Sequence, residues 1–159
     1  MQSSAKSPSA YLLSYRDEEP EEHQRLNSQH DVIQNAILGD SLIHPSIRFP
    51  RPRVAIADIA CGTGIWLEDV RKNLAIEQKH KALVLVGFDV TSHGFDFGLM
   101  PAIRLIKHDC TEVFPNEFIG QFDLVNIRGL AFAVPQDGFS RLVANAVRLL
   151  RKLHLSLQS

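Results

Sequence analysis

The sequence predicts an α/β protein built on a parallel β-sheet, and three observations support this fold class. A short apolar run, residues 54–59, leads directly into a turn that contains Gly62 and Gly64. The residues from Ile65 onward suit a helix, and a second apolar run, residues 82–89, follows that helix. Continuous apolar runs are typical of buried parallel strands, and the order strand, helix, strand implies a right-handed parallel unit.

Length, charge and cysteine content exclude several classes of protein. A chain of 159 residues has room for one domain with one core. Its 17 Lys and Arg against 18 Asp and Glu give a net charge of -1, so no basic field favours nucleic acid or an anionic membrane as a partner. No apolar stretch reaches about 20 residues, the length of a membrane span, and the start lacks a secretory h-region. The two cysteines, Cys61 and Cys110, form no Cys-x-x-Cys pair. We therefore expect a cytoplasmic protein, with the nucleus as the alternative, and no membrane partner.

The first 50 residues are predicted to form a tail and a helical segment. Residues 1–10 are rich in Ser and are expected to be disordered, and residues 11–50 form an N-terminal helical lid segment before the main domain, residues 51–159. Acidic residues around Pro20 suit a helix start, and an apolar stripe predicts a helix over residues 21–38 that stops at Gly39. The stripe consists of Leu26, His30, Ile33 and Ile37. His30 on this stripe either contacts a ligand, a substrate for example, or is a hydrogen-bonded core histidine.

The main domain continues the alternation of strands and helices. Residues 65–74 predict a helix, and residues 103–106 and 122–128 predict a third and a fourth strand. Residues 91–101 are an irregular connection or a short helix. Residues 138–153 are predicted to form an amphipathic helix, because apolar side chains recur three or four positions apart: Phe139, Leu142, Val143, Ala146, Leu149, Leu150 and Leu153.

Acidic side chains stand where the predicted strands end. Asp89 ends the second strand, where it is placed either to accept both hydroxyls of a ribose or to cap a loop. Asp109 follows the third strand, where it accepts a hydrogen bond from an adenine amine or caps a turn. The turn at Gly62 and Gly64 lets the next helix direct its free N–H groups at a ligand. These features predict a nucleotide-like cofactor.

The turn and the strand ends together resemble the class I S-adenosylmethionine-dependent methyltransferases. The shared pattern is the run Asp58-Ile-Ala-Cys-Gly-Thr-Gly64, with Asp89 after the second strand and Asp109 after the third. Five motifs look like the fungal secondary-metabolism methyltransferases, the LaeA-like group: Arg25-Leu-Asn-Ser-Gln-His30, His44-Pro-Ser-Ile47, Gly62-Thr-Gly-Ile-Trp66, Gly87-Phe-Asp89 and Gly120-Gln-Phe-Asp123. The resemblance runs over residues 11–151. It implies a Rossmann-like sheet and S-adenosyl-L-methionine as the cofactor.

The resemblance also implies a set of cofactor-binding residues. They are Asp58, Ala60, Cys61, Gly62, Gly64, Asp89, Val90, Asp109, Cys110 and Arg128. In the family pattern, the backbone of the turn would hold the methionyl part of the cofactor. Ala60 stands where many class I enzymes have their first glycine, and we expect it to be a tolerated variant.

The other implied roles belong to side chains at the strand ends. Asp89 would bind the ribose hydroxyls, and Asp109 with Cys110 would bind the adenine. Residues 126–128, which include Arg128, would form the floor beneath the amino group, and Asp58 would steady the turn or that amine. His30 is the candidate substrate contact. No residue is assigned as a general base, and the histidines show no metal-ligand spacing.

One departure from the family concerns the C-terminal half of the sheet. The family continues with a Pro-Gly-Gly turn and three further strands, whereas here Leu153, Leu155 and Leu157 alternate either as a strand stub or as one more helical turn. We therefore expect a C-terminally truncated domain with strand order 3-2-1-4 that lacks strands 5 to 7. The fourth strand would then be an apolar edge, which favours self-association or a heteromeric partner.

Three other functions were weighed against methyl transfer. A nicotinamide-dependent dehydrogenase needs a third glycine where this chain has Leu67, and a serine hydrolase needs a Gly-x-Ser-x-Gly motif that the sequence does not contain. The remaining rival is a catalytically incompetent methyltransferase-like protein that acts as an interaction module. The prediction is S-adenosylmethionine-dependent methyl transfer to a small-molecule acceptor, with the interaction module as the alternative.

Overall fold

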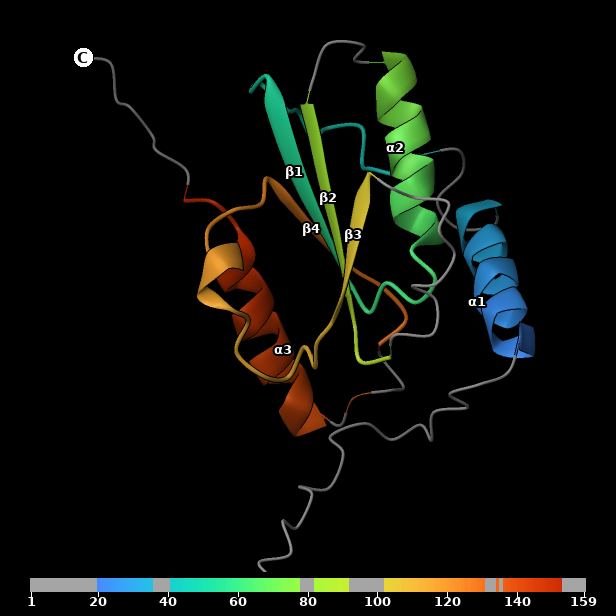
Figure 1. Cartoon of the computed structure of the whole chain (residues 1–159), viewed down its shortest axis with the longest axis vertical. Coiled ribbons are helices and arrows are strands. Elements are labelled where there is room, and N and C mark those ends of the chain that lie inside the picture. Colours follow the sequence, from blue (N-terminus) through green and yellow to red (C-terminus); the bar gives the residue numbers. More distant parts are fainter. Residues whose placement is uncertain are drawn as a thin grey trace, which may run out of the picture.

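The computed structural model of the chain describes residues 20–35, 41–77, 82–91, 102–130, 134 and 136–152. Its elements, in chain order, are α1 (Pro20–Ile33), β1 (Arg53–Ile59), α2 (Ile65–Glu77), β2 (Ala82–Asp89), β3 (Ile103–Lys107), the short 3-10 helix η3 (Asn116–Phe118), β4 (Leu124–Ile127) and α3 (Gln136–Leu149). Figure 1 shows the central sheet with α2 and α3 on its two sides. The N-terminal tail predicted for residues 1–10 and the connection predicted for residues 92–101 lie outside the described residues.

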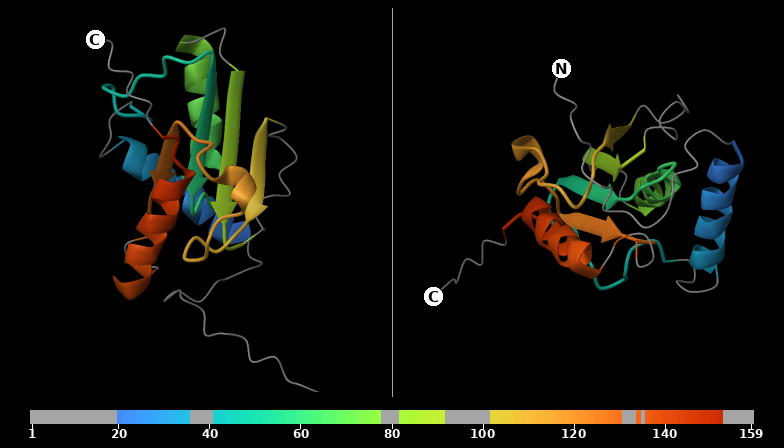
Figure 2. Two further views of the ribbon diagram at one scale, coloured as in Figure 1. Left: turned by 90° about the vertical axis from the view of Figure 1, so that its left-hand side faces the viewer. Right: turned by 90° about the horizontal axis from the view of Figure 1, so that it is seen from below.

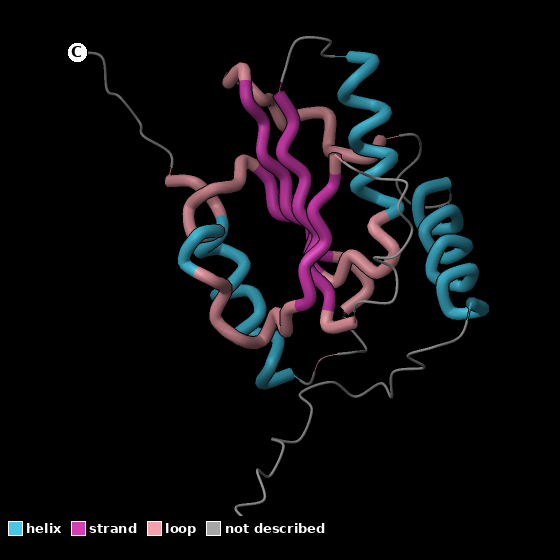
Figure 3. Tube along the Cα trace, in the orientation of Figure 1, coloured by secondary structure: helices cyan, strands magenta, loops and turns pink. Residues whose placement is uncertain are grey.

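The four strands form one parallel sheet in the order β3-β2-β1-β4, which confirms the predicted fold class and strand order. In the register, Asp58 of β1 lies between Gly87 of β2 and Asn126 of β4. Because all the strands are paired in parallel, their carboxyl ends meet at one end of the sheet, whose strands lie side by side in Figure 3. This end carries the glycine turn and the acids that follow the strands.

Both faces of the sheet are covered, so β1 is buried on both sides. Alternate residues of β1 pack into two different clusters: Ala55, Ala57 and Ile59 face the cluster that includes α3, and Val54 and Ile56 face the cluster that includes α2. This double burial explains why β1 reads as a continuous apolar run. Figure 2 shows α1 on the outer side of α2, away from α3.

The predicted boundaries of β1 and β2 agree with the structure, while the fourth strand and the last helix differ. Phe122 lies outside β4 and forms a parallel bridge with Leu150. Its N–H donates to Leu149 O at 3.0 Å, and its C=O accepts from Arg151 N at 2.9 Å. The helix therefore ends at Leu149, and the predicted extension to residue 153 is wrong, because the backbone after Leu149 pairs with the segment before β4.

The last helix also buries fewer of its apolar side chains than predicted. Leu142, Ala146 and Leu149 are buried, but a second row remains in solvent. The members of this row are exposed to 43% (Phe139), 41% (Val143), 59% (Val147) and 38% (Leu150). The apolar residues cover a wider arc of the helix than the sheet can contact. We call these four residues, of which Leu150 directly follows the helix, the outer stripe of α3. The expected association through the edge of the fourth strand stays a prediction.

The helix predicted in the N-terminal segment agrees with the structure only in part. The helix predicted over residues 21–38 begins at Pro20, with Glu21 and Glu22 in its first turn, and its α-helical part ends at Ile33. Residues 36–40, and with them its predicted stop, lie outside the described residues. Among the residues that are described, no helix is long and apolar enough to cross a membrane.

Candidate functional site

The turn after β1 is built from three left-handed residues. Ala60, Gly62 and Gly64 have φ angles of 56°, 53° and 78°. Glycine takes this conformation easily, whereas a side chain strains it. Ala60 therefore adopts the backbone of the glycine that many class I enzymes have at this position. The turn is closed by a hydrogen bond from Gly64 N to Cys61 O at 2.9 Å, and α2 begins at the next residue.

The carboxylate of Asp89 joins this turn to the end of β2. Its Oδ2 accepts a hydrogen bond from Gly62 N at 2.8 Å, and its Oδ1 accepts from both the N–H and the hydroxyl of Thr91 at 3.0 Å. The loop-capping role considered for Asp89 is therefore present. A carboxylate oxygen can accept two hydrogen bonds, so Oδ2 retains capacity for a ligand. Val90, the next residue, is partly buried beside it.

Asp58 is a buried acid at the end of β1. Its side chain is nearly inaccessible, and its Oδ1 accepts a hydrogen bond from Asn126 Nδ2 at 2.7 Å. Burial raises the pKa of Asp58 to about 7, an effect that Asn126 and the charge of Arg128 oppose and that Asp89 reinforces. Asp58 thus sits between Asp89 and Arg128 at the same end of the sheet.

Asp109 and Cys110 lie after β3 in different environments. Asp109 Oδ1 accepts from the N–H and the hydroxyl of Thr111 at 2.9 Å and 2.7 Å, so the turn cap is present here too. The preceding residue, His108, donates its N–H to Asp89 O at 2.7 Å, which holds Asp109 near the end of β2. Cys110 is buried in the core cluster that includes α3. The structure therefore brings Asp109 to the strand ends and turns Cys110 into the core.

Cys61 is a packing residue of the turn. Its thiol fills the space above Gly87: an ideal Cβ at residue 87 would lie 2.7 Å from Cys61 Sγ and 2.6 Å from Leu105 Cδ2. Burial, with the charges of Asp58 and Asp89, raises the pKa of this thiol well above its usual value. Cys61 is therefore held in its neutral form and shapes the turn by its volume.

Helix α1 lies against the glycine turn. An ideal Cβ at Gly62 would be 3.3 Å from Leu26 Cδ1, and Asn27 Oδ1 accepts a hydrogen bond from the Thr63 hydroxyl at 2.6 Å. These contacts place the helix over the start of α2. The lid role of this segment stays a prediction.

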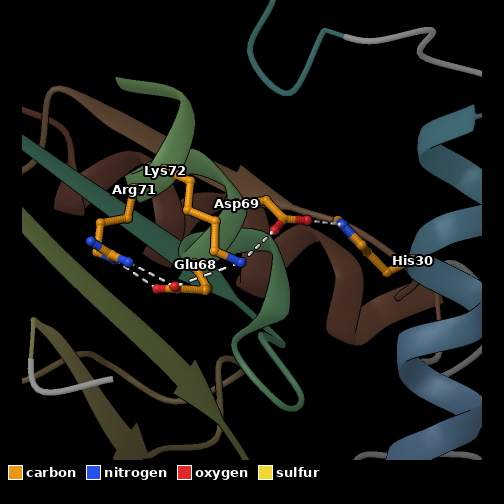
Figure 4. Close-up of polar contacts among 5 residues, drawn as sticks. All are labelled: His30, Glu68, Asp69, Arg71 and Lys72. Carbon is orange, nitrogen blue, oxygen red and sulfur yellow. Dashed lines mark hydrogen bonds and ion pairs between the residues drawn. The ribbon is translucent and has the colours of Figure 1, made fainter. Parts of the chain in front are cut away.

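His30 of α1 connects α2 with the end of β4. Its Nε2 is 3.0 Å from Asp69 Oδ2, and its Nδ1 is 3.0 Å from Arg128 Nη2. Figure 4 shows Asp69 between His30 and Lys72, with Glu68 and Arg71 beside them on α2. His30 is thus a buried, hydrogen-bonded histidine, and the substrate contact stays a prediction.

Comparisons with known proteins agree with this geometry. No family model matches the sequence. The N-methyltransferase gliN of Aspergillus fumigatus is 30% identical over 131 residues, which are 82% of this chain and 43% of that protein. The methyltransferase grgD of a Penicillium species is 32% identical over 148 residues, 90% of this chain and 49% of that protein. The N-methyltransferase verN of Clonostachys rogersoniana is 32% identical over 120 residues, 74% of this chain and 38% of that protein.

The chain belongs to the class I S-adenosylmethionine-dependent methyltransferases. Two solved structures share its fold. A putative S-adenosylmethionine-dependent methyltransferase from Methanococcus maripaludis superposes with a TM-score of 0.53 at 13% identity, over 87% of this chain and 64% of that one. A complex of the Haloferax volcanii Trm112 methyltransferase activator with a putative methyltransferase gives a TM-score of 0.58 at 15% identity, over 87% of this chain and 56% of that one.

The methyltransferase chain spans less than half the length of the curated relatives named above, with 43%, 49% and 38% of their residues covered. Its described part holds the glycine turn and the ends of all four strands. The described part therefore includes the end of the sheet at which α/β folds bind nucleotides. Whether the domain is truncated stays a prediction.

The residues at this end of the methyltransferase sheet fit the head group of S-adenosylmethionine in charge. Asp58 is a carboxyl group that can face an ammonium group, and Arg128 carries a buried Nη1 with no hydrogen-bond partner among the described residues. An orphaned guanidinium donor suits a carboxylate. No group of His, Cys, Asp and Glu that could hold a metal ion occurs in the part of the chain that the structure describes.

The sequence placed the acids at the strand ends but gave no role to several residues that contact the turn, His30 or Arg128. Asn27, Thr63, Trp66 and Asp69 had no assigned role, although all of them except Asp69 lie inside quoted motifs. The Arg128 guanidinium lies 5.6 Å from the centre of the Trp66 ring, and Asp69 bonds to His30. Contacts between distant parts of the chain leave no local pattern, so the sequence held no signal for Asp69.

Proposed function

We propose that this chain binds S-adenosyl-L-methionine at the glycine turn and takes part in methyl transfer to a small-molecule acceptor of fungal secondary metabolism. The hydrogen bond from Gly62 N to Asp89 Oδ2 at 2.8 Å supports this most directly. It joins the turn after β1 to the acid that ends β2. These are the two features that dinucleotide-type folds use for phosphate or sugar recognition.

The proposed binding mode follows from the polar groups at the strand ends. Asp89 would accept a hydrogen bond from a ribose hydroxyl with the free capacity of Oδ2. Asp58 would face the ammonium of the amino-acid head group, where a positive charge favours the ionised carboxyl. Asp109 and Val90 would border the adenine. Arg128 would lie beneath the head group.

The bound cofactor would supply a methyl group on a positively charged sulfur, and the protein would supply position. Displacement at a methyl group depends on bringing the nucleophile into line with the bond that breaks. Both ring nitrogens of His30 already have partners, which leaves neither free to remove a proton from an acceptor. We therefore assign no general base to the described residues.

The relatives suggest which acceptors to test first. Two of them are named N-methyltransferases, gliN and verN. Nitrogen-containing small molecules are thus the first candidates. Because the chain covers less than half of each of these relatives, the acceptor is part of the proposal and not of the family assignment.

Calorimetric titration with S-adenosylmethionine and S-adenosylhomocysteine tests the proposal. Binding in the micromolar range is the expected result, and replacing Asp89 with Ala should weaken it about 10- to 150-fold, the loss of a hydrogen bond to a charged group. Glu117→Ala is the matched control, because this exposed acid of η3 pairs with Arg104 of β3 and has no role at the turn. A thermal melt of each variant separates lost binding from lost folding.

The same titration decides against the rival function. An interaction module without a cofactor gives no heat with either ligand at high micromolar concentration, and that result would overturn the methyltransferase proposal. Binding by the wild type with unchanged affinity in Asp89→Ala would instead overturn only the ribose assignment.

A further inference from the structure

Two hydrogen bonds connect His30 with Asp69 and Arg128 and so join three elements. We call this pair of hydrogen bonds the bridge. His30 of α1 contacts Asp69 of α2 through Nε2 and Arg128, just after β4, through Nδ1, both at 3.0 Å. The side chain of His30 is only 4% exposed, while that of Asp69 is 34% exposed. Arg128 is separated from His30 by 98 positions in the sequence. The bridge therefore holds the guanidinium of Arg128 from the side of α1.

The geometry assigns the proton of His30. A guanidinium group can only donate, so Nδ1 of His30 must accept from Arg128 Nη2. The remaining proton is then on Nε2, which donates to the carboxylate of Asp69. Every polar atom of the imidazole is satisfied in this neutral tautomer.

The other half of the guanidinium is left without a partner. Arg128 Nη1 is buried and makes no hydrogen bond to the described part of the chain. Trp66, whose ring lies under the guanidinium at 5.6 Å, carries a second buried donor, Nε1, that is equally unpaired among those residues. Buried donors of this kind carry a free-energy penalty unless an acceptor binds them. The unpaired Nη1 of Arg128 is a donor to which an acceptor from a ligand can bind.

We propose that His30 is a positioning residue that, backed by Asp69, holds Arg128 so that the free Nη1 binds the carboxylate of the cofactor's amino-acid head group. This inference rests on the proposed function, since it assigns a group of the same ligand. An arginine held on one side by His30 and from below by Trp66 presents a fixed donor, and a carboxylate matches such a donor in charge and shape. Asp58, whose carboxyl group interacts electrostatically with Arg128, faces the opposite charge of the same head group.

The test compares S-adenosylhomocysteine with its decarboxylated analogue, which lacks only the carboxylate. Wild-type protein should bind S-adenosylhomocysteine at least about tenfold more tightly than the analogue, the value of one charge-assisted hydrogen bond. In Arg128→Gln the two ligands should bind with equal affinity.

Variants of His30 test the positioning role. His30→Leu removes both hydrogen bonds and should lower the preference for S-adenosylhomocysteine to about threefold or less. His30→Gln should keep most of the preference, because its amide can accept from Arg128 and donate to Asp69. Asp69→Ala, on a partly exposed helical position, gives a second test if His30→Leu does not fold. Arg71→Gln is the matched control, since Arg71 pairs with Glu68 on the same helix and does not contact the bridge.

Three results would overturn this inference. Equal binding of the two ligands by the wild type shows that the carboxylate has no partner. A loss in Arg128→Gln that is equal for both ligands shows a structural role only. An unchanged preference in both His30→Leu and Asp69→Ala shows that the bridge does not position Arg128. No binding of either ligand to the wild type is a different outcome, because it overturns the proposed function itself.

Discussion

Asp58 lies at the end of β1, between the glycine turn and Arg128, with its carboxyl group buried. Burial is the main reason why its pKa rises from 3.8 to about 7. The folded state therefore holds a proton on Asp58 at pH values where the unfolded chain has already released it. Between about pH 4 and pH 7 the folded state binds more protons, so this residue contributes less stability as the pH rises.

Replacement of Asp58 with Asn should remove this dependence on pH. The wild type and Asp58→Asn should have similar free energies of unfolding near pH 4, and the variant should become the more stable of the two by up to about 4 kcal/mol above pH 7, from a shift of about three pKa units. Denaturant unfolding from pH 4 to pH 8 measures the difference. A constant difference across this range would contradict the prediction.

At the scale of elements, α1 depends on side-chain contacts to stay over the glycine turn. Its contacts with the turn include the hydrogen bond from Thr63 to Asn27 at 2.6 Å and the packing of Leu26 near Gly62. If the buried Thr63 hydroxyl is removed, Asn27 Oδ1 loses this hydrogen-bond donor. The position of α1 thus rests in part on one hydroxyl group of the turn.

Thr63→Val should loosen α1 without changing the shape of the turn. The isosteric change removes one part-buried hydrogen bond, a loss of about 1 kcal/mol, and the amides of residues 21–33 should exchange faster. Hydrogen exchange followed by mass spectrometry measures this, with Arg25→Gln as a control on the exposed side of the same helix, where Arg25 pairs with Glu22. Equal protection of α1 in wild type and Thr63→Val would show that the hydroxyl does not hold the helix.

The elements differ in how far the sequence could predict them, and the reason is physical. β1 and β2 are buried on both faces, so the apolar composition of each segment alone marks where the strand ends. The acids that follow these strands could therefore be placed at one end of the sheet. The end of α3 depends on the pairing of Leu150 with Phe122, two residues far apart in the chain. The partners of His30 and Arg128 depend on contacts across 98 positions and had no local signature.

At the scale of the molecule, the outer stripe of α3 brings together four exposed apolar side chains. Phe139, Val143, Val147 and Leu150 lie along it, each at least 38% exposed. Exposed apolar patches of this kind commonly mark interfaces. The occupant we expect in a solution of the isolated chain is a second copy, because both copies present the same stripe.

Val147→Lys should therefore reduce self-association and leave the fold intact. Val147 is 59% exposed, so its replacement should change the free energy of unfolding by no more than about 0.5 kcal/mol. Sedimentation velocity at rising concentration measures the change, and Arg141→Gln controls for altered charge on the same helix. A wild type that stays monomeric at all concentrations would contradict the prediction.

The contact between Cys61 and Gly87 has a consequence for how this sequence can vary. An added Cβ at residue 87 would meet Sγ of Cys61 at 2.7 Å, and Cys61 belongs to the cofactor turn while Gly87 belongs to the neighbouring strand. A larger residue at position 87 would also meet Leu105 Cδ2 at 2.6 Å, so it needs room at positions 61 and 105 together. Sequence change at position 87 is therefore coupled to the turn through Cys61 and to β3 through Leu105, and these three positions are expected to change together among descendants of this protein.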